Sequence, residues 1–170
     1  MTPKLRLERV VKRFGDNVVC DGIDLEVRVG EMVCLIGASG AGKSVLMRAI
    51  LDLVPKQAGT IRLFGQDVDA IGPEARQRLN RRYGVLFQMG ALFSSLTVRE
   101  NIQVPMRENH RMSQRLMDEL ALVKLDMVGL SRAAADRLPS ELSGGMIKRA
   151  GLARALALDP ELVFLDEPTS

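Results

Sequence analysis

The sequence is short of cysteine, aromatic residues and long apolar runs, and each shortage excludes a class of protein. Cys20 and Cys34 lack metal-site spacing, and Cys34 lies in an apolar run, so a buried, reduced thiol is expected at Cys34. No apolar run reaches the roughly 18 residues that a membrane-spanning helix needs. The N-terminus also lacks the apolar stretch of a signal peptide, which favours a cytosolic protein.

An excess of one sign of charge is also lacking, because 24 basic and 21 acidic residues leave a net charge of only +3 at pH 7. The densest basic segment contains Arg76, Arg78, Arg81 and Arg82, and no aromatic residue is interleaved with them. Nucleic-acid sites commonly combine basic with stacking aromatic side chains. We therefore interpret these arginines as a solvated helix face and predict no nucleic-acid partner. The 170 residues suffice for a single domain with its own core.

The segment 37–44 fits the phosphate-binding pattern G-x-x-x-x-G-K-[ST]. The apolar run 32–36 before it predicts a buried parallel strand, and the apolar segment 45–54 after it predicts a helix. Glycines at such a turn let backbone N–H groups point at a phosphate, and the helix dipole favours the anion. The predicted phosphate-binding residues are Gly37, Ala38, Ser39, Gly40, Ala41, Gly42, Lys43, Ser44 and Val45.

Acidic residues follow a second apolar run, which predicts a buried strand at 162–165. Asp166 and Glu167 stand at its carboxyl end, where ligands of open parallel sheets bind, so we expect them to meet the phosphate loop. Lys43 is placed to reach the β- and γ-phosphates, and Ser44 and Asp166 to hold Mg²⁺. Glu167 is predicted to polarise the water that attacks the γ-phosphate.

A Leu-Ser-Gly-Gly segment precedes a helix that is expected at 147–158. The open N–H groups of Gly144 and Gly145, with the hydroxyl of Ser143, are predicted to form a second phosphate-binding site. A simple helix cap is the alternative, because Ser-Gly-Gly suits any helix start.

Apolar and turn-forming patterns divide the rest of the chain into short elements. Strands are expected at 4–10, 23–29, 60–64 and 83–87, and a short helix at 73–79. Residues 90–142 are expected to be mostly helical, with Ser113 as a helix cap. Of the methionines in this part of the chain, Met112, Met117 and Met127 are interpreted as core packing.

Taken together, these motifs resemble the ATP-binding subunits of ATP-binding cassette (ABC) transporters, over the whole chain. Residues 37–44 are similar to the Walker A motif, 142–146 to the signature motif and 162–167 to Walker B. The resemblance makes Gln88 the Q-loop glutamine, a further catalytic residue and Mg²⁺ ligand. It makes Phe14 the aromatic residue that stacks on adenine, although Phe14 suits a core position equally well.

The resemblance implies an α/β fold with a P-loop NTPase core of ABC ATPase type, a mixed sheet flanked by helices. Residues 1–88 and 143–170 would form this core, and 89–142 a helical insert. ATP and Mg²⁺ are the implied cofactors, with Lys43, Gln88 and Glu167 as catalytic residues. Two copies would form a head-to-tail dimer, in which each ATP lies between one Walker A motif and the other copy's signature motif.

Residues 86–93, 97–102 and 139–146 are similar to the Mla-type ATPases, including Met146 where ABC proteins generally carry glutamine. Those ATPases serve permeases linked to MCE lipid-binding proteins and move phospholipids between bacterial membranes. The resemblance implies a peripheral motor subunit on the cytoplasmic face of the inner membrane. Its partners would be a second copy, a permease contacting about Met89 to Met106, and an MCE-type protein through that permease.

Two alternatives stay open, namely a soluble ABC ATPase outside transport and an ATP-binding fragment without turnover. In the resembled family, a D-loop and a switch histidine follow the position of Ser170. His110 lies far upstream and is interpreted as a surface residue. The sequence is therefore expected to be C-terminally incomplete, with an exposed sheet edge, and to hydrolyse ATP poorly.

Overall fold

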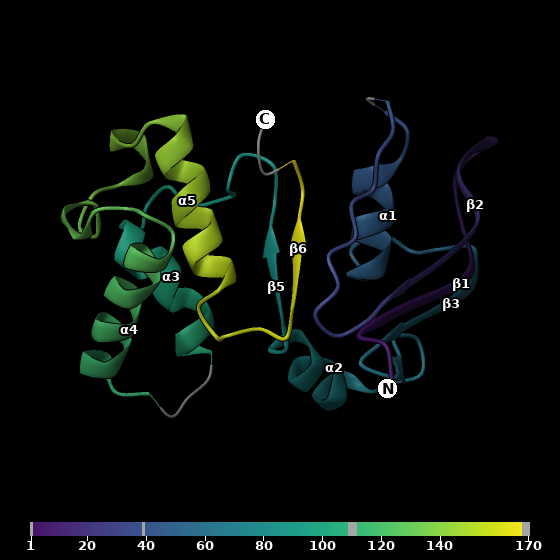
Figure 1. Ribbon diagram of the computed structural model, residues 1–170, viewed down its shortest axis with the longest axis horizontal. Coiled ribbons are helices and arrows are strands. Elements are labelled where there is room, and N and C mark those ends of the chain that lie inside the picture. Colours follow the sequence, from purple (N-terminus) through teal and green to yellow (C-terminus); the bar gives the residue numbers. More distant parts are fainter. Residues whose placement is uncertain (1, 39, 109–111, 168–170) are drawn as a thin grey trace. The chain divides into compact units, whose positions relative to one another are not determined.

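The computed structural model describes residues 2–38, 40–108 and 112–167 (Figure 1). The chain forms two compact units, Met1–Leu79 and Asn80–Ser170. Ser39 and His110, which the sequence analysis singled out, lie outside the described residues. None of the described helices has the length and apolar character needed to cross a bilayer.

The first unit is built on an antiparallel sheet with strand order β2-β1-β3-β4 (Figure 1). Its strands are β1 (Leu5–Phe14), β2 (Asn17–Val27), β3 (Ala58–Leu63) and β4 (Gln66–Asp67). Leu5 and Leu7 of β1 are buried with Ile61 and Leu63 of β3, because alternate strand side chains point to the same face. The helices α1 (Lys43–Ile50) and α2 (Pro73–Asn80) complete the unit.

The strand β1 continues four residues beyond its predicted end, because its pairing with β2 extends to Phe14 opposite Asn17. Gly15 closes the hairpin with a left-handed backbone (φ 57°), as the predicted turn requires. Both strands therefore end at one tight turn, with Phe14 beside it.

The strand predicted before the phosphate loop does not form. Residues 31–38 have no regular secondary structure, and Met32 and Ile36 are 95% and 93% exposed. A buried strand needs a hydrogen-bonded neighbour, and no described strand pairs with this run. Cys34 is exposed for the same reason, so its predicted burial is wrong, whereas Cys20 in β2 is buried.

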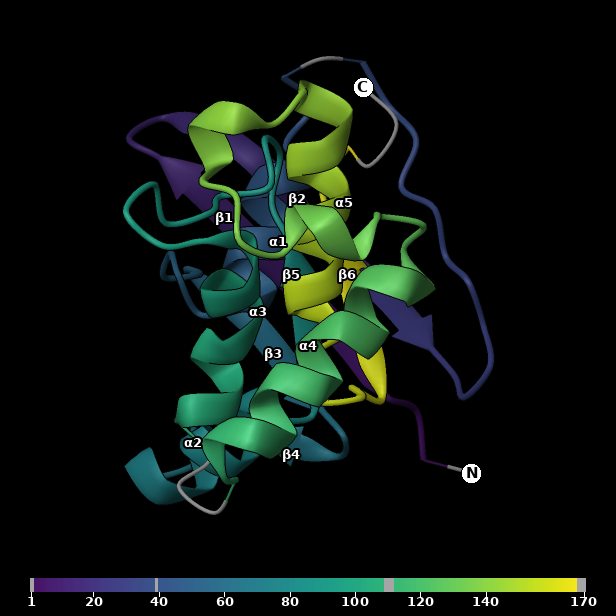
Figure 2. The same ribbon diagram turned by 90° about the vertical axis from the view of Figure 1, so that its left-hand side faces the viewer.

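The second unit combines a two-stranded parallel sheet with a group of helices (Figure 2). Its elements are β5 (Tyr83–Leu86), α3 (Val98–Arg107), α4 (Gln114–Met127), η1 (Arg132–Ala134), η2 (Pro139–Glu141), α5 (Gly144–Ala155) and β6 (Leu162–Leu165). The helices α3, α4 and α5 contact one another, and α5 packs on β5. The described residues between 90 and 142 contain no strand, as predicted.

The helices of the second unit enclose their own apolar core, and their starts are capped by hydroxyl side chains. Ser113 accepts a hydrogen bond from the Leu116 N–H, which confirms the predicted cap. Met117 belongs to this core as predicted, whereas Met127 is exposed. Met106 is buried in the same core, so it cannot be part of a contact surface for a permease, which corrects that expectation.

Candidate functional site

The helix α1 begins at Lys43, directly after the glycine loop. Gly40 (φ 79°) and Gly42 (φ 91°) have a left-handed backbone, which other residues adopt at a cost. Gly42 is also the N-cap of α1, and a Cβ there would lie 2.5 Å from Cγ1 of Val19 in β2. Position 42 therefore requires glycine for its backbone conformation and for its lack of a side chain.

We expect Gly42→Ala to lower the melting temperature by more than Gly40→Ala does. Both changes place a side chain on a left-handed residue, at about 1–2 kcal/mol. Only the alanine at position 42 would also meet Val19, because a Cβ at Gly40 has no atom within 4 Å. Thermal unfolding of both variants measures the difference, and equal melting temperatures would contradict the packing role of Gly42.

The Lys43 side chain folds back over its own loop. Its Nζ donates to the carbonyl oxygens of Gly37, at 2.6 Å, and of Ala38, at 2.9 Å. The first turn of α1 contains no acidic residue, and its N–H groups carry the positive end of the helix dipole. An ammonium and a helix N-terminus at one glycine loop complement an anion such as a phosphate.

The remaining loop residues surround this helix start. Gly37, Ala38, Gly40 and Ala41 are exposed, whereas Ser44 and Val45 are half-buried at the start of α1. A polyphosphate approaching the loop would meet backbone rather than bulky side chains.

The parallel pairing of β5 and β6 brings Gln88 and Glu167 together in the second unit. Leu86 lies opposite Leu165, so both strands reach their carboxyl ends at the same edge. Gln88 Nε2 donates to Glu167 Oε2 at 2.6 Å. Asp166 is buried beside them, and its N–H donates to the Leu86 carbonyl at 2.9 Å.

Strained backbone also occurs at the same edge. Glu167 has a positive φ of 48°, and so do three consecutive residues after Gln88: Met89 (69°), Gly90 (73°) and Ala91 (49°). Non-glycine residues in this conformation cost about 1–3 kcal/mol each, and such strain is common at functional sites.

Arg154 of α5 holds this strained segment. Its guanidinium donates to the carbonyls of Gly90, at 3.1 Å, and Ala91, at 2.9 Å, and lies 5.8 Å from the centre of the Phe93 ring. Burial lowers the pKa of Arg154, because removal from water disfavours its charge. Asn101 of α3 binds the C-terminal end of this segment, where its side chain accepts a hydrogen bond from the Phe93 N–H and donates one to the Phe93 carbonyl.

We expect Arg154→Met to lower the free energy of unfolding by about 2 kcal/mol, since charged donors to the carbonyls of Gly90 and Ala91 are lost. A chain of this size should then melt about 4–8 °C lower. Arg149→Met is the matched control on α5, because Arg149 also donates to carbonyls but is exposed. Thermal unfolding gives both values, and equal losses would show that Arg154 does not hold the segment.

The signature-like segment forms the start of α5. Ser143 is the N-cap, and its Oγ accepts a hydrogen bond from the Met146 N–H at 3.3 Å. A Cβ on Gly144 or Gly145 would have no atom within 4 Å, so there is open space in front of these two residues. The segment thus forms a side-chain helix cap, and the space beside its two glycines can accommodate an anion.

Phe14 lies at the end of β1 and is 52% exposed, so the alternative that it is a core residue is wrong. It stands two residues past Lys12, the last buried residue of β1. An exposed aromatic ring is available for stacking.

The predicted Mg²⁺ ligands offer a hydroxyl, an amide carbonyl and a carboxylate, from Ser44, Gln88 and Asp166 in turn. Oxygen donors of this kind suit Mg²⁺, which commonly takes one or two carboxylates together with substrate phosphates. Ser44 belongs to the first unit and the other two residues to the second. Their meeting around one ion stays a prediction.

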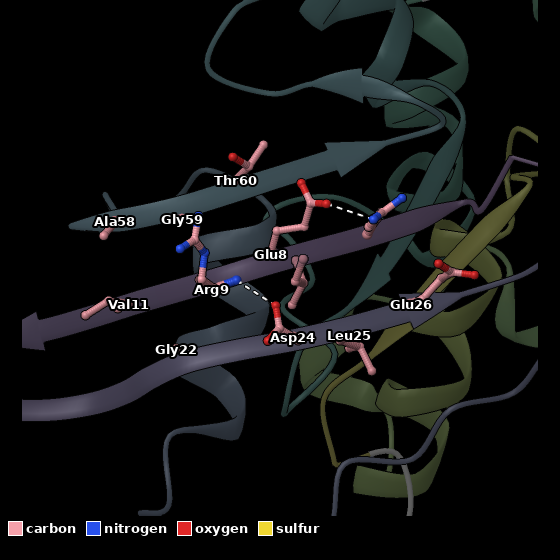
Figure 3. Close-up of a pocket in the computed structure, with 12 residues that line it drawn as sticks. Glu8, Arg9, Val11, Gly22, Asp24, Leu25, Glu26, Ala58, Gly59 and Thr60 are labelled. Carbon is pink, nitrogen blue, oxygen red and sulfur yellow. Dashed lines mark hydrogen bonds and ion pairs between the residues drawn. The ribbon is translucent and has the colours of Figure 1, made fainter.

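A separate hollow of about 1070 Å³ lies on the sheet of the first unit, over β1, β2 and β3 (Figure 3). Among its lining residues, Glu8 forms ion pairs with Arg6 and Arg62, and Asp24 accepts a hydrogen bond from the backbone N–H of Arg9 at 2.8 Å. None of the predicted nucleotide-binding residues lines it. It therefore does not replace the glycine loop as the candidate site.

Comparison with known protein families shows which family this chain belongs to. The family model described as ABC transporter matches residues 20–170. The chain belongs to the ABC transporter family. It is 39% identical over 164 residues to the intermembrane phospholipid transport system ATP-binding protein MlaF of Haemophilus influenzae, covering 96% of this chain and 62% of that protein.

Further ABC relatives show a similar degree of likeness. The MlaF protein of Escherichia coli K12 is 40% identical over 154 residues, covering 91% of this chain and 57% of that protein. The probable ribonucleotide transport ATP-binding protein mkl of Mycobacterium leprae is 36% identical, covering 98% and 48%. The chain thus spans about half to three fifths of the length of these ABC proteins.

Solved structures confirm the predicted fold class. The ATP-binding cassette MJ0796, solved as a dimer in a post-hydrolysis state with ADP and Pi, superposes with a TM-score of 0.89 at 30% identity. The likeness covers 97% of this chain and 74% of that cassette. The mixed α/β architecture is therefore that of an ABC ATPase cassette.

Proposed function

We propose that this chain binds MgATP and is the ATP-hydrolysing motor of an ABC transporter that moves phospholipids. The glycine loop at the start of α1, with Lys43 folded over it, is the observation that carries this proposal. The MlaF relatives support phospholipid as the cargo, because they are more similar to the chain than the mkl relative is.

In this proposal, the loop from Gly37 to Lys43 binds the phosphates of ATP. Lys43 exchanges its two carbonyl contacts for the β- and γ-phosphate oxygens, while the N–H groups at the start of α1 donate to the same chain of phosphates. Mg²⁺, held by Ser44, Gln88 and Asp166, would neutralise charge on the phosphate oxygens. Phe14 stacks on the adenine base.

Hydrolysis then proceeds by in-line attack of water on the γ-phosphorus. A bond forms between the water oxygen and phosphorus, and the bond to the β–γ bridging oxygen breaks, with its electron pair leaving on ADP. Glu167 takes the proton from the water and is oriented by the amide of Gln88, which already donates to its carboxylate. The products are ADP and inorganic phosphate.

The signature segment acts on a second copy of this chain. Ser143, Gly144 and Gly145 donate to the γ-phosphate of the ATP bound by that copy, in a head-to-tail dimer. The exposed side chains of Met89 and Phe93 contact a membrane permease, through which an MCE-type lipid-binding protein is linked. The protein then works peripherally, on the cytoplasmic face of the inner membrane.

Calorimetric titration with MgATP tests the binding step, and fractionation of cell extracts tests the transport role. We expect saturable binding at one site per chain, and recovery of the protein with membranes that contain its permease. Absence of binding would refute the nucleotide site. Recovery with ribosomes instead of membranes would favour a soluble ABC ATPase outside transport.

A further inference from the structure

Lys12 of β1 is a buried lysine that the proposed reaction does not use. Only 3% of the Lys12 surface is exposed, although a lysine is rarely buried without a partner for its charge. Its Nζ donates to the carbonyl of Pro55 at 2.6 Å and lies 4.5 Å from the centre of the Phe14 ring. A carbonyl and a ring face therefore surround its ammonium.

These contacts join the end of β1 to the segment that follows α1. Besides the bond from Lys12 to Pro55, the Gln57 N–H donates to the Val11 carbonyl at 2.9 Å. The Arg13 N–H donates to Oε1 of Gln57 at 2.7 Å. The backbone on either side of Lys12 is thus fixed by other hydrogen bonds. The contact with the Phe14 ring, in contrast, is made by the Lys12 side chain itself.

The residue opposite Lys12 on β2 is Cys20. Burial raises the pKa of the Cys20 thiol, and the nearby Lys12 charge opposes this only in part. The thiol is therefore neutral at pH 7 and does not compete with the Phe14 ring for the ammonium.

The Phe14 ring remains half exposed although the Lys12 ammonium covers part of it. A cation bound to one face of an aromatic ring holds the ring in place by its attraction to the ring quadrupole. The exposed face is then presented in a fixed orientation, and nucleotide bases stack on such faces.

We propose that Lys12 is a positioning residue for nucleotide-base recognition, which holds the Phe14 ring so that a purine base stacks on its free face. This inference rests on the proposed binding of ATP. It makes the affinity for the base depend on a buried cation, separately from the affinity for the phosphates.

The test compares the binding of MgATP with that of inorganic triphosphate and Mg²⁺, which lacks the base. We expect Lys12→Gln, which keeps a hydrogen-bond donor without the charge, to weaken ATP binding about five- to tenfold. Triphosphate binding should change by less than about twofold. In a Phe14→Ala background, Lys12→Gln should have no further effect on ATP, because the two residues act as a pair.

Lys4→Gln is the matched control, since Lys4 Nζ lies 5.4 Å from the centre of the Phe64 ring in the same unit. It should alter neither affinity. Equal weakening of ATP and triphosphate by Lys12→Gln, no weakening at all, or full additivity with Phe14→Ala would each overturn the inference. If Lys12→Gln lowers the melting temperature, Lys12→Arg replaces it as the test. Arginine keeps the positive charge, so ATP affinity should be retained in Lys12→Arg if the cation holds the ring, and its loss there would overturn the inference.

A different experimental result is expected if the proposed ATP binding itself is wrong. The unsubstituted protein would then bind neither MgATP nor triphosphate, whatever residue stands at position 12. Binding of both ligands by the unsubstituted protein, with no effect of Lys12→Gln, would overturn the positioning role alone.

Discussion

Lys43→Ala is expected to abolish the thermal stabilisation that MgATP gives this protein. The Lys43 ammonium lies at the glycine loop, where it donates to the exposed carbonyls of Gly37 and Ala38, contacts that we expect it to exchange for phosphate oxygens. With ATP at 100 times its dissociation constant, binding should add about 2.7 kcal/mol to the free energy of unfolding. For a chain of this size, the melting temperature should rise by about 5–11 °C.

Thermal unfolding with and without MgATP measures this effect. Lys56→Ala is the control, because Lys56 belongs to the same unit, pairs with Asp69 and lies outside the glycine loop. It should keep the full shift. The ligand-free Lys43→Ala variant should melt close to the unsubstituted protein, since exposed contacts contribute little to stability. A full shift in Lys43→Ala would refute the role of Lys43 in binding phosphate.

The second large effect concerns turnover. We expect Glu167→Gln to reduce phosphate release by a factor of about 10²–10⁴, because the amide cannot take the proton of the attacking water. The thermal shift with MgATP should persist, since Glu167 lies outside the glycine loop. Phosphate release over several turnovers, measured in the assembled transporter, gives the rate.

Glu161→Gln is the matched control for this experiment. Glu161 directly precedes β6 and pairs with Arg82, so the variant removes the same charge away from Gln88. It should keep the rate of the unsubstituted protein. Undiminished release in Glu167→Gln would exclude Glu167 as the general base. ATP binding without any release by the unsubstituted protein would favour a nucleotide-binding module without turnover.

The glycine turn before α1 was predictable because its residues are neighbours in sequence and depend on local backbone geometry, whereas its binding of phosphate stays a prediction. The rule for parallel strands, whose carboxyl ends lie at one edge, leads us to expect Asp166 and Glu167 at the phosphate loop, which stays a prediction. The contact between Gln88 and Glu167 was not predicted, although it lies at such an edge. The division into a core and a helical insert at 89–142 stays a prediction.

Other features could not be read from local patterns. The run from Met32 to Ile36 has the composition of a buried strand, but pairing depends on a distant neighbour, and none of the described strands provides it. Arg154 and Lys12 were missed because both bind backbone carbonyls far away in sequence. Such contacts leave no motif, and the only hint is a charged residue among small or apolar neighbours.

The exposed run from Met32 to Ile36 has a consequence for handling the purified protein. It is uncharged, lacks proline and is rich in side chains that favour β-structure, so it is suited to intermolecular strand pairing. Aggregation through such a segment depends on protein concentration and time and needs no unfolding of the rest of the chain. Dilution should therefore slow the loss of purified protein to aggregates, even where the fold itself is stable.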